Sequence, residues 1–186
     1  MKQAAQMILT LSLIGALSGI VLALVNTWAS PLITRSELKS KETAILMVQP
    51  GAVSYEQLPL ENYEVYRVFD DTSAPLGYAM VHSGLGYQSL IKVMIGISND
   101  LSTIHAIKIL AHNETPGLGT LVNEPEFLDQ FKGLSTTPNI TWVSGELPDA
   151  PNEVQTITGA TITSRVVVGI VGEAVANLRI MKEQLP

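Results

Sequence analysis

A charge-free stretch near the N-terminus constrains this chain more than any other feature. No charged residue stands between Lys2 and Arg35. Inside this stretch an apolar segment runs from Met7 to Trp28, and its 22 residues match the ~20 that an α-helix needs to cross the hydrocarbon layer of a bilayer. The sequence therefore predicts one membrane-spanning helix at the start of the chain.

The end of this segment separates two expected parts of the chain. Trp28 stands where an amphipathic ring prefers the membrane interface, and Pro31 is expected to end the helix. We expect a transmembrane anchor over residues 1–34 and a single domain over residues 35–186. A cleaved signal peptide is the competing interpretation, but its apolar region would span only ~7–15 residues. The charges that flank the segment leave open which side of the membrane carries the domain.

Composition narrows the chemistry that the domain can perform. The chain has 11 Lys and Arg against 17 Asp and Glu, a net charge of -6, which argues against a nucleic-acid binder because such a protein needs a basic face. Cysteine is absent, so disulfides, thiolate nucleophiles and cysteine-ligated iron–sulfur clusters are excluded. Any redox function would need an organic cofactor or another subunit.

The remaining residues predict an α+β domain in which strand pairs of a twisted antiparallel sheet are packed by a few helices. Alternating patterns bounded by turn residues favour strands. The turns Asp70–Ser73 and Ser98–Asp100 would join two of these pairs. Strands are expected over residues 63–70, 77–82, 89–97, 103–110 and 139–143.

Three helices are expected in the domain. The first covers residues 34–48, with Ser36 as a plausible N-cap, and is expected to continue from the membrane helix. A short one covers residues 125–132 and the last covers 162–184, where apolar residues recur at intervals of 3 and 4. The stripe on this last helix consists of Val167, Val171, Ala174, Leu178 and Met181, and Glu173, Arg179 and Lys182 occupy its remaining surface.

Four hydroxyl residues stand in a row of seven, TGATITS, immediately before the last helix. Gly159 allows a tight turn there, and Thr163 or Ser164 would cap the helix by accepting hydrogen bonds from its free N–H groups. These N–H groups and the helix dipole form a site suited to a phosphate. Taken alone, the pattern is also explained by a capped helix without any ligand.

A second motif, HNETPGLG, covers residues 112–119. Pro116 and Gly117 favour a turn, and a glycine-rich loop of this kind brings backbone N–H groups close to a planar ligand. Taken alone, the segment could be a plain turn after strand 103–110. Elsewhere, we interpret His82 and His105 as structural, and the acidic cluster of Glu124, Glu126 and Asp129 as a solvated helix face.

Together the two motifs resemble those of a known family. The chain resembles the FMN-binding G subunit of the Rnf complex and the C subunit of the sodium-pumping NADH:quinone reductase. In that family an HxETPGLG-like loop precedes an [ST]GAT[IL]TS segment, and both follow one N-terminal membrane helix. The resemblance covers essentially the whole chain, including the region Gly84–Tyr87. The chain's length favours the Rnf protein.

The resemblance implies a cofactor and its site. Thr161 would carry FMN through a phosphoester that a dedicated flavin transferase makes, and no catalytic residue or metal site is expected. His112 lies beside the loop and could touch the flavin. The other residues expected to form the pocket are Thr158, Gly159, Ala160, Thr163, Glu114, Thr115, Gly117, Leu118 and Gly119.

The resemblance also implies a setting. The chain would be an electron-carrier subunit of an Rnf-type ferredoxin:NAD oxidoreductase that couples electron flow to Na⁺ or H⁺ transport, without turnover of its own. It would lie in the cytoplasmic membrane as a single-pass protein, with its domain on the extracytoplasmic side and other Rnf subunits and membrane lipid as partners. Three alternatives remain: the corresponding role in a sodium-pumping NADH:quinone reductase, a flavin-free assembly module, and a stand-alone anchored reductase. Gln155, which stands where the family usually has Asp, would favour the flavin-free module.

Overall fold

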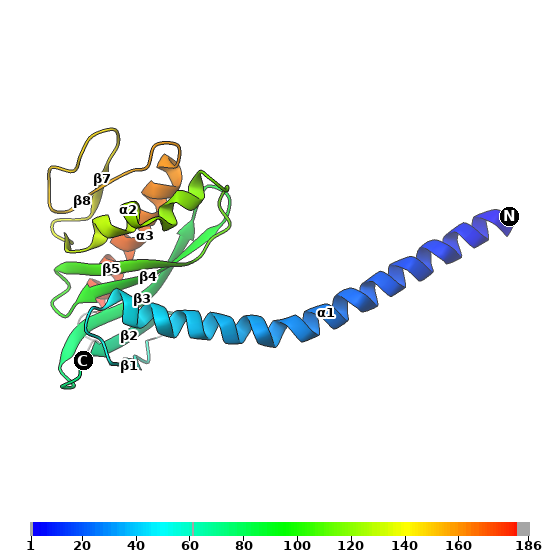
Figure 1. Cartoon of the computed structure of the whole chain (residues 1–186), viewed down its shortest axis with the longest axis horizontal. Helices are drawn as coiled ribbons and strands as arrows, with labels where there is room; N and C mark the ends of the chain where they lie inside the picture. Colours follow the sequence, from blue (N-terminus) through cyan, green and yellow to red (C-terminus); the bar gives the residue numbers. More distant parts are fainter. Residues whose placement is uncertain (1, 61, 182–186) are drawn as a thin grey trace. The chain divides into compact units, whose positions relative to one another are not determined.

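The computed structural model describes residues 2–60 and 62–181 (Figure 1). It divides into two compact units, Met1–Ser40 and Lys41–Pro186. Helix α1 spans Lys2–Val48 and passes through both units as one continuous helix. The boundary expected after residue 34 therefore lies inside a helix.

The expectation that Pro31 ends the first helix is wrong, because Pro31 lies inside α1. Serine and threonine hydroxyls surround it: Ser30 donates to the Asn26 carbonyl at 2.8 Å, and Thr34 donates to the Ser30 carbonyl at 3.1 Å. Neither bond reaches the carbonyl of Thr27, which stands four residues before Pro31 and loses its backbone donor there. Proline inside a helix is nevertheless tolerated in membrane-spanning segments. Since the helix never stops, Ser36 does not act as an N-cap.

The apolar segment of α1 is exposed along its whole length. Its large side chains, from Met7 at 70% to Trp28 at 72%, find no cover within the part of the chain that the structure describes. Both α1 and the last helix are long and apolar enough to cross a membrane, but the apolar window of α1 is uncovered, whereas half of that of the last helix is buried. An uncovered apolar helix of this length is what a membrane span requires.

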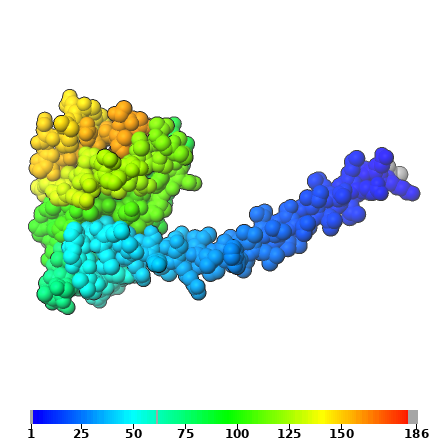
Figure 2. Space-filling model, viewed as in Figure 1, coloured from blue at the N-terminus to red at the C-terminus, as the bar shows by residue number. Residues whose placement is uncertain are grey.

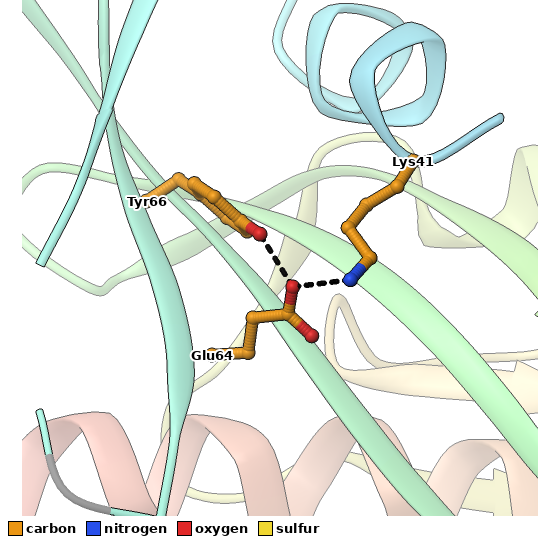
Figure 3. A network of polar contacts seen from close by, with 3 residues as sticks. All are labelled: Lys41, Glu64 and Tyr66. Carbon is orange, nitrogen blue, oxygen red and sulfur yellow. Dashed lines mark hydrogen bonds and ion pairs between the residues drawn. The ribbon is translucent and has the colours of Figure 1, made fainter. Parts of the chain in front are cut away.

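The last turns of α1 belong to the domain and cover one face of its sheet. Ala44, Ile45 and Val48 are buried there. Figure 3 shows Glu64 accepting from both Lys41, at 2.5 Å, and the Tyr66 hydroxyl.

Close packing at this face depends on a glycine and a glutamine. A Cβ on Gly96 would stand 2.7 Å from the carbonyl carbon of Val48. The buried Gln49 donates to the carbonyls of Tyr78 and Ile97 at 2.7 and 2.9 Å. The end of the helix is therefore fixed to the sheet both by shape and by hydrogen bonds.

The sheet has six antiparallel strands that follow one another in sequence order (Figure 1). All four strands expected before residue 112 are confirmed, as is the α+β fold. The two edge strands, at residues 54–57 and 134–135, were not predicted from the sequence. The bounds are Ser54–Gln57 for β1, Glu64–Phe69 for β2, Pro75–Leu85 for β3, Leu90–Ser98 for β4, Thr103–Ala111 for β5 and Leu134–Ser135 for β6.

The opposite face of the sheet carries the main core. Helix α3, Thr161–Ile180, packs on it through the expected stripe, whose five residues are all buried. Lys182 and the end of the helix expected over 162–184 lie outside the described residues. Phe127 and Phe131 fill the space beside it with an edge-to-face contact. They come from the expected short helix, which the structure divides into α2 (Pro125–Leu128) and the 3₁₀ turn η2 (Asp129–Phe131).

A small lobe contacts the start of α3. The expected strand β7, Thr141–Val143, pairs in parallel with β8, Glu153–Gln155, which the sequence did not predict. The Arg165 guanidinium of α3 stacks over the Trp142 ring at 3.8 Å from its centroid. In Figure 2 this lobe, coloured yellow, lies at the surface beside the orange segment that contains the N-terminal part of α3.

Candidate functional site

The loop after β5 is organised around Glu114. Its Oε1 accepts hydrogen bonds from the backbone N–H groups of Gln88 and Ser89 at 3.0 and 3.2 Å, and its Oε2 accepts from the Thr163 hydroxyl at 3.0 Å. The β3–β4 hairpin, the loop 112–119 and the TGATITS segment thus meet at one carboxylate. Motifs far apart in the sequence are brought together here.

The electrostatics of Glu114 follow from this arrangement. Burial alone would raise the pKa of the Glu114 carboxyl, since it disfavours the charged form. The N–H group of Gln88 and the hydroxyl of Thr163 outweigh this effect, and the net result is a pKa below the ordinary value for glutamate. The residue is only 5% exposed, so a buried negative charge lies in this part of the molecule.

The TGATITS segment turns at Gly159, which has a φ of +85°, a region that favours glycine. Helix α3 then begins at Thr161, and the first N–H bonded inside it is that of Ser164, to the Ala160 carbonyl at 2.9 Å. The N–H groups of the first three residues therefore precede the first bond of the helix.

The capping expected from Thr163 or Ser164 is wrong, because both lie inside α3, and no side chain among the described residues caps this helix. The Thr163 hydroxyl is directed to Glu114 instead. That of Ser164 donates to the Ala160 carbonyl and accepts from the N–H of Ile157. The free N–H groups and the positive end of the helix dipole remain available to an anion.

The two motifs line one cleft of about 390 Å³. Eight of the ten residues expected to form the pocket lie in its wall: Glu114, Thr115, Leu118, Gly119, Gly159, Ala160, Thr161 and Thr163. The other two do not: Gly117 stands at the turn with a φ of +74°, and Thr158 lines a neighbouring groove of about 360 Å³.

Two further residues of the cleft wall, Tyr87 and Ile162, were missing from the expected site. Both are exposed, at 64% and 54%, and Leu118 beside them is 49% exposed. The cleft thus combines a polar interior at Glu114 with an apolar rim. Tyr87 could have been found from the sequence, because it belongs to the Gly84–Tyr87 region that the resemblance already covers.

The histidines have structural partners. His112 Nδ1 accepts from the backbone N–H of Glu114 at 3.3 Å, and its Nε2 lies 2.6 Å from the Asn123 amide nitrogen. His82 contacts Glu173 at 3.4 Å, a partner that the sequence analysis did not foresee. His105 binds the buried Gln49, and burial lowers the pKa of its imidazole.

The acidic residues offer no metal site. Glu124, Glu126 and Asp129 are exposed, as expected for a solvated face. The described residues contain no group of three or more His, Cys, Asp or Glu side chains that could hold a metal ion. The cleft is the candidate site because both motifs line it.

Comparison with known proteins finds a family whose matched stretch spans both motifs. The family of FMN-binding domains matches residues 86–176, which include both motifs. The G subunit of the ion-translocating oxidoreductase complex of Methanosarcina acetivorans is 30% identical over 184 residues, covering 94% of each chain. The G subunit of the Na⁺-translocating ferredoxin:NAD⁺ oxidoreductase complex of Acetobacterium woodii is 32% identical over 177 residues, covering 86% of this chain and 84% of that one.

Solved structures share the fold. The C subunit of the Na⁺-translocating NADH-quinone reductase from Parabacteroides distasonis has a TM-score of 0.56 at 27% identity, covering 63% of this chain and 61% of that one. NqrC of Shewanella oneidensis has a TM-score of 0.55 at 23% identity, covering 70% and 72%. The relatives, the matched domain and the fold agree, and the chain belongs to the family of FMN-binding G subunits of ion-translocating oxidoreductase complexes.

Proposed function

We propose that this chain is the membrane-anchored electron-transfer subunit of an Rnf-type ferredoxin:NAD oxidoreductase and that it carries FMN as a phosphoester on Thr161. One observation carries the proposal: the two motifs meet in a single cleft, and the first residue of α3 in its wall is Thr161. The similarity to the G subunits of two ion-translocating complexes supports the assembly.

The cleft fits FMN in size and in polarity. Its volume of about 390 Å³ falls within the ~300–1,000 Å³ typical of small-molecule sites. The uncapped start of α3 suits a phosphate, and the exposed side chains of Tyr87, Leu118 and Ile162 suit an aromatic ring. When bound, FMN would supply transfer of one or two electrons.

Two features of the cleft support our proposal that another enzyme makes the attachment. The Thr161 hydroxyl makes only a long 3.4 Å bond to the Ile157 carbonyl, which leaves its oxygen available for an ester. A threonine hydroxyl is a weak nucleophile unless a base activates it. Glu114 already accepts three hydrogen bonds, so it is a poor base, and we assign the reaction to an external flavin transferase.

The membrane setting is part of the proposal. The exposed apolar segment of α1 would lie in the cytoplasmic membrane, among lipid and the other subunits of the complex, with the domain on the extracytoplasmic side. Electron flow through the subunit would be coupled to transport of Na⁺ or H⁺. If a reporter enzyme that works only in the cytoplasm were active when fused after residue 181, this topology would be contradicted.

The deciding experiment is the intact mass of the protein isolated from its native membrane. We expect a gain of one FMN less one water, absent from Thr161→Ala and present in a Thr141→Ala control. Thr141 is an exposed threonine of β7 outside the cleft. An unmodified wild-type mass would overturn the proposal and favour the flavin-free assembly module, whereas a modified Thr161→Ala protein would move the attachment to another residue.

A further inference from the structure

Among the described residues of the cleft wall, Glu114 joins the loop after β5 to both other segments. The Gln88 and Ser89 N–H groups fix one carboxylate oxygen to the β3–β4 hairpin, and the Thr163 hydroxyl fixes the other to α3. A further bond ties the same loops, because the Asn113 N–H donates to the Ser89 hydroxyl at 2.7 Å. The relative position of the three segments therefore depends on this side chain.

Two glycines make room for the carboxylate. A Cβ on Gly119 would stand 2.7 Å from the Glu114 Cβ and 2.9 Å from its Oε2. A Cβ on Gly86 would stand 2.8 Å from both Ile91 Cδ1 and the Ser89 carbonyl oxygen, and closer still to Glu114 Oε1. At both glycines a side chain would be closer than 3.0 Å to its neighbours, so the backbone of two loops closes directly on the carboxylate.

The charge of Glu114 is stabilised without being cancelled. All three donors are neutral groups, and within residues 2–60 and 62–181 no Lys, Arg or His forms an ion pair with it. The lowered pKa of its carboxyl agrees with a group that stays ionised at neutral pH. A full negative charge is therefore held in the wall of the cleft.

We propose that Glu114 is a positioning residue that holds the three segments of the cleft in place and that its uncompensated charge lowers the midpoint potential of a flavin bound there. This inference rests on the proposed function. Reduction adds electron density to a flavin, and a nearby negative charge disfavours that change. The role differs from ring binding, because it acts through charge and through the loops.

The test compares Glu114→Gln with the wild type, both isolated with their flavin from the native membrane. Glutamine fills the same volume and keeps an oxygen that can accept from Gln88 and Ser89, so the protein is expected to fold and to carry FMN. Its midpoint potential is expected to be more positive, with a ratio of reduced to oxidised flavin roughly tenfold higher at a fixed applied potential. Glu146→Gln, which removes an exposed charge in the β7–β8 lobe, should leave the potential unchanged.

A second variant separates charge from packing. Ser89→Ala removes the bond from the Asn113 N–H that ties the same loops and keeps the carboxylate with its three donors, so the potential of its flavin should stay close to that of the wild type. An unchanged potential in loaded Glu114→Gln, or an equal shift in both variants, would overturn the role of the charge. A folded Glu114→Gln protein without FMN would overturn it as well.

The positioning role can be measured without flavin. In a Thr161→Ala background, replacing Glu114 by Ala is expected to speed hydrogen exchange at the Gln88 and Ser89 amides, since both lose their acceptor. Unchanged exchange would overturn the positioning role. Absence of FMN from the wild type would instead overturn the proposed function, and the role of the charge with it, so the two failures are distinguishable.

Discussion

Replacing Gly96 by alanine should destabilise the domain more than any ordinary glycine substitution. The new methyl group would stand 2.7 Å from the carbonyl carbon of Val48, 2.9 Å from its Cβ, and closer still to its carbonyl oxygen. The obstacle is backbone, and the bonds from Gln49 to the Tyr78 and Ile97 carbonyls prevent it from moving away. Relief therefore requires the helix and the sheet to separate locally.

The magnitude follows from this geometry. Overpacking in a core costs about 1–3 kcal/mol, and a rigid obstacle places Gly96→Ala at the upper end, about 3 kcal/mol. For a chain of this size the melting temperature should fall by about 6–12 °C. The assay is thermal unfolding of the full chain in detergent, followed by circular dichroism at a wavelength where loss of the sheet is seen.

The matched control is Gly169→Ala in α3. Nothing lies within 4 Å of a Cβ at Gly169, so alanine should stabilise the helix by about 0.5–1 kcal/mol through its better helix propensity. The two substitutions are chemically identical and should act in opposite directions. A Gly96→Ala protein that melts at the wild-type temperature would refute the claim that the last turns of α1 are pressed onto the sheet.

Two further predictions concern the same face of the sheet. Burial raises the pKa of the Glu64 carboxyl, but its bonds to Lys41 and Tyr66 outweigh burial and hold this pKa below the ordinary value for glutamate. The stability that these bonds contribute is therefore present above the ordinary value and is lost as the pH falls through the lowered pKa. Because Lys41 and Glu64 are partly exposed, the wild type should be more stable than Glu64→Gln by at most about 1 kcal/mol near neutral pH. Urea titrations should show that this difference in the free energy of unfolding vanishes on acidification. A difference that stays constant with pH would contradict a stabilising role for the Glu64 charge. Gln49→Leu removes the donor to two strand carbonyls and should lower the free energy of unfolding by about 2–3 kcal/mol. The control Gln57→Leu, at an exposed position of β1, should lower it by less than about 0.5 kcal/mol. Equal losses in the two variants would show that the buried amide is dispensable.

The sequence predicted the elements whose signal is local. Strands β2 to β5 are six or more residues long and are bounded by turn residues, and the stripe of α3 is periodic, so both were found. The short strands β1, β6 and β8 were missed, because segments of two to four residues become strands only through their neighbours. Pro31 was misjudged because the rule that proline ends a helix comes from soluble proteins, whereas membrane helices tolerate proline in their interior.

The residues of the candidate site were likewise predicted where the signal is local in sequence and missed where it depends on distant partners. The two motifs and eight residues of the cleft wall were predicted from the resemblance. The burial of Glu114 was not, because its partners Ser89 and Thr163 are 25 and 49 positions away in sequence. The capping role given to Thr163 was wrong for the same reason: a local rule assigned to the helix a hydroxyl that a distant carboxylate uses.

The last turns of α1 bear on where the chain could be cut. Val48 and its neighbours cover Tyr66, Val68, Ala79 and Met94, which are buried on this face of the sheet. A protease that cleaves within residues 35–40 would leave that cover attached to the shed fragment. Cleavage a few positions later would strip it away and bare an apolar sheet prone to self-association. The part of the chain that must stay whole for this face of the sheet to remain covered therefore begins at Lys41, inside a helix and not in a linker.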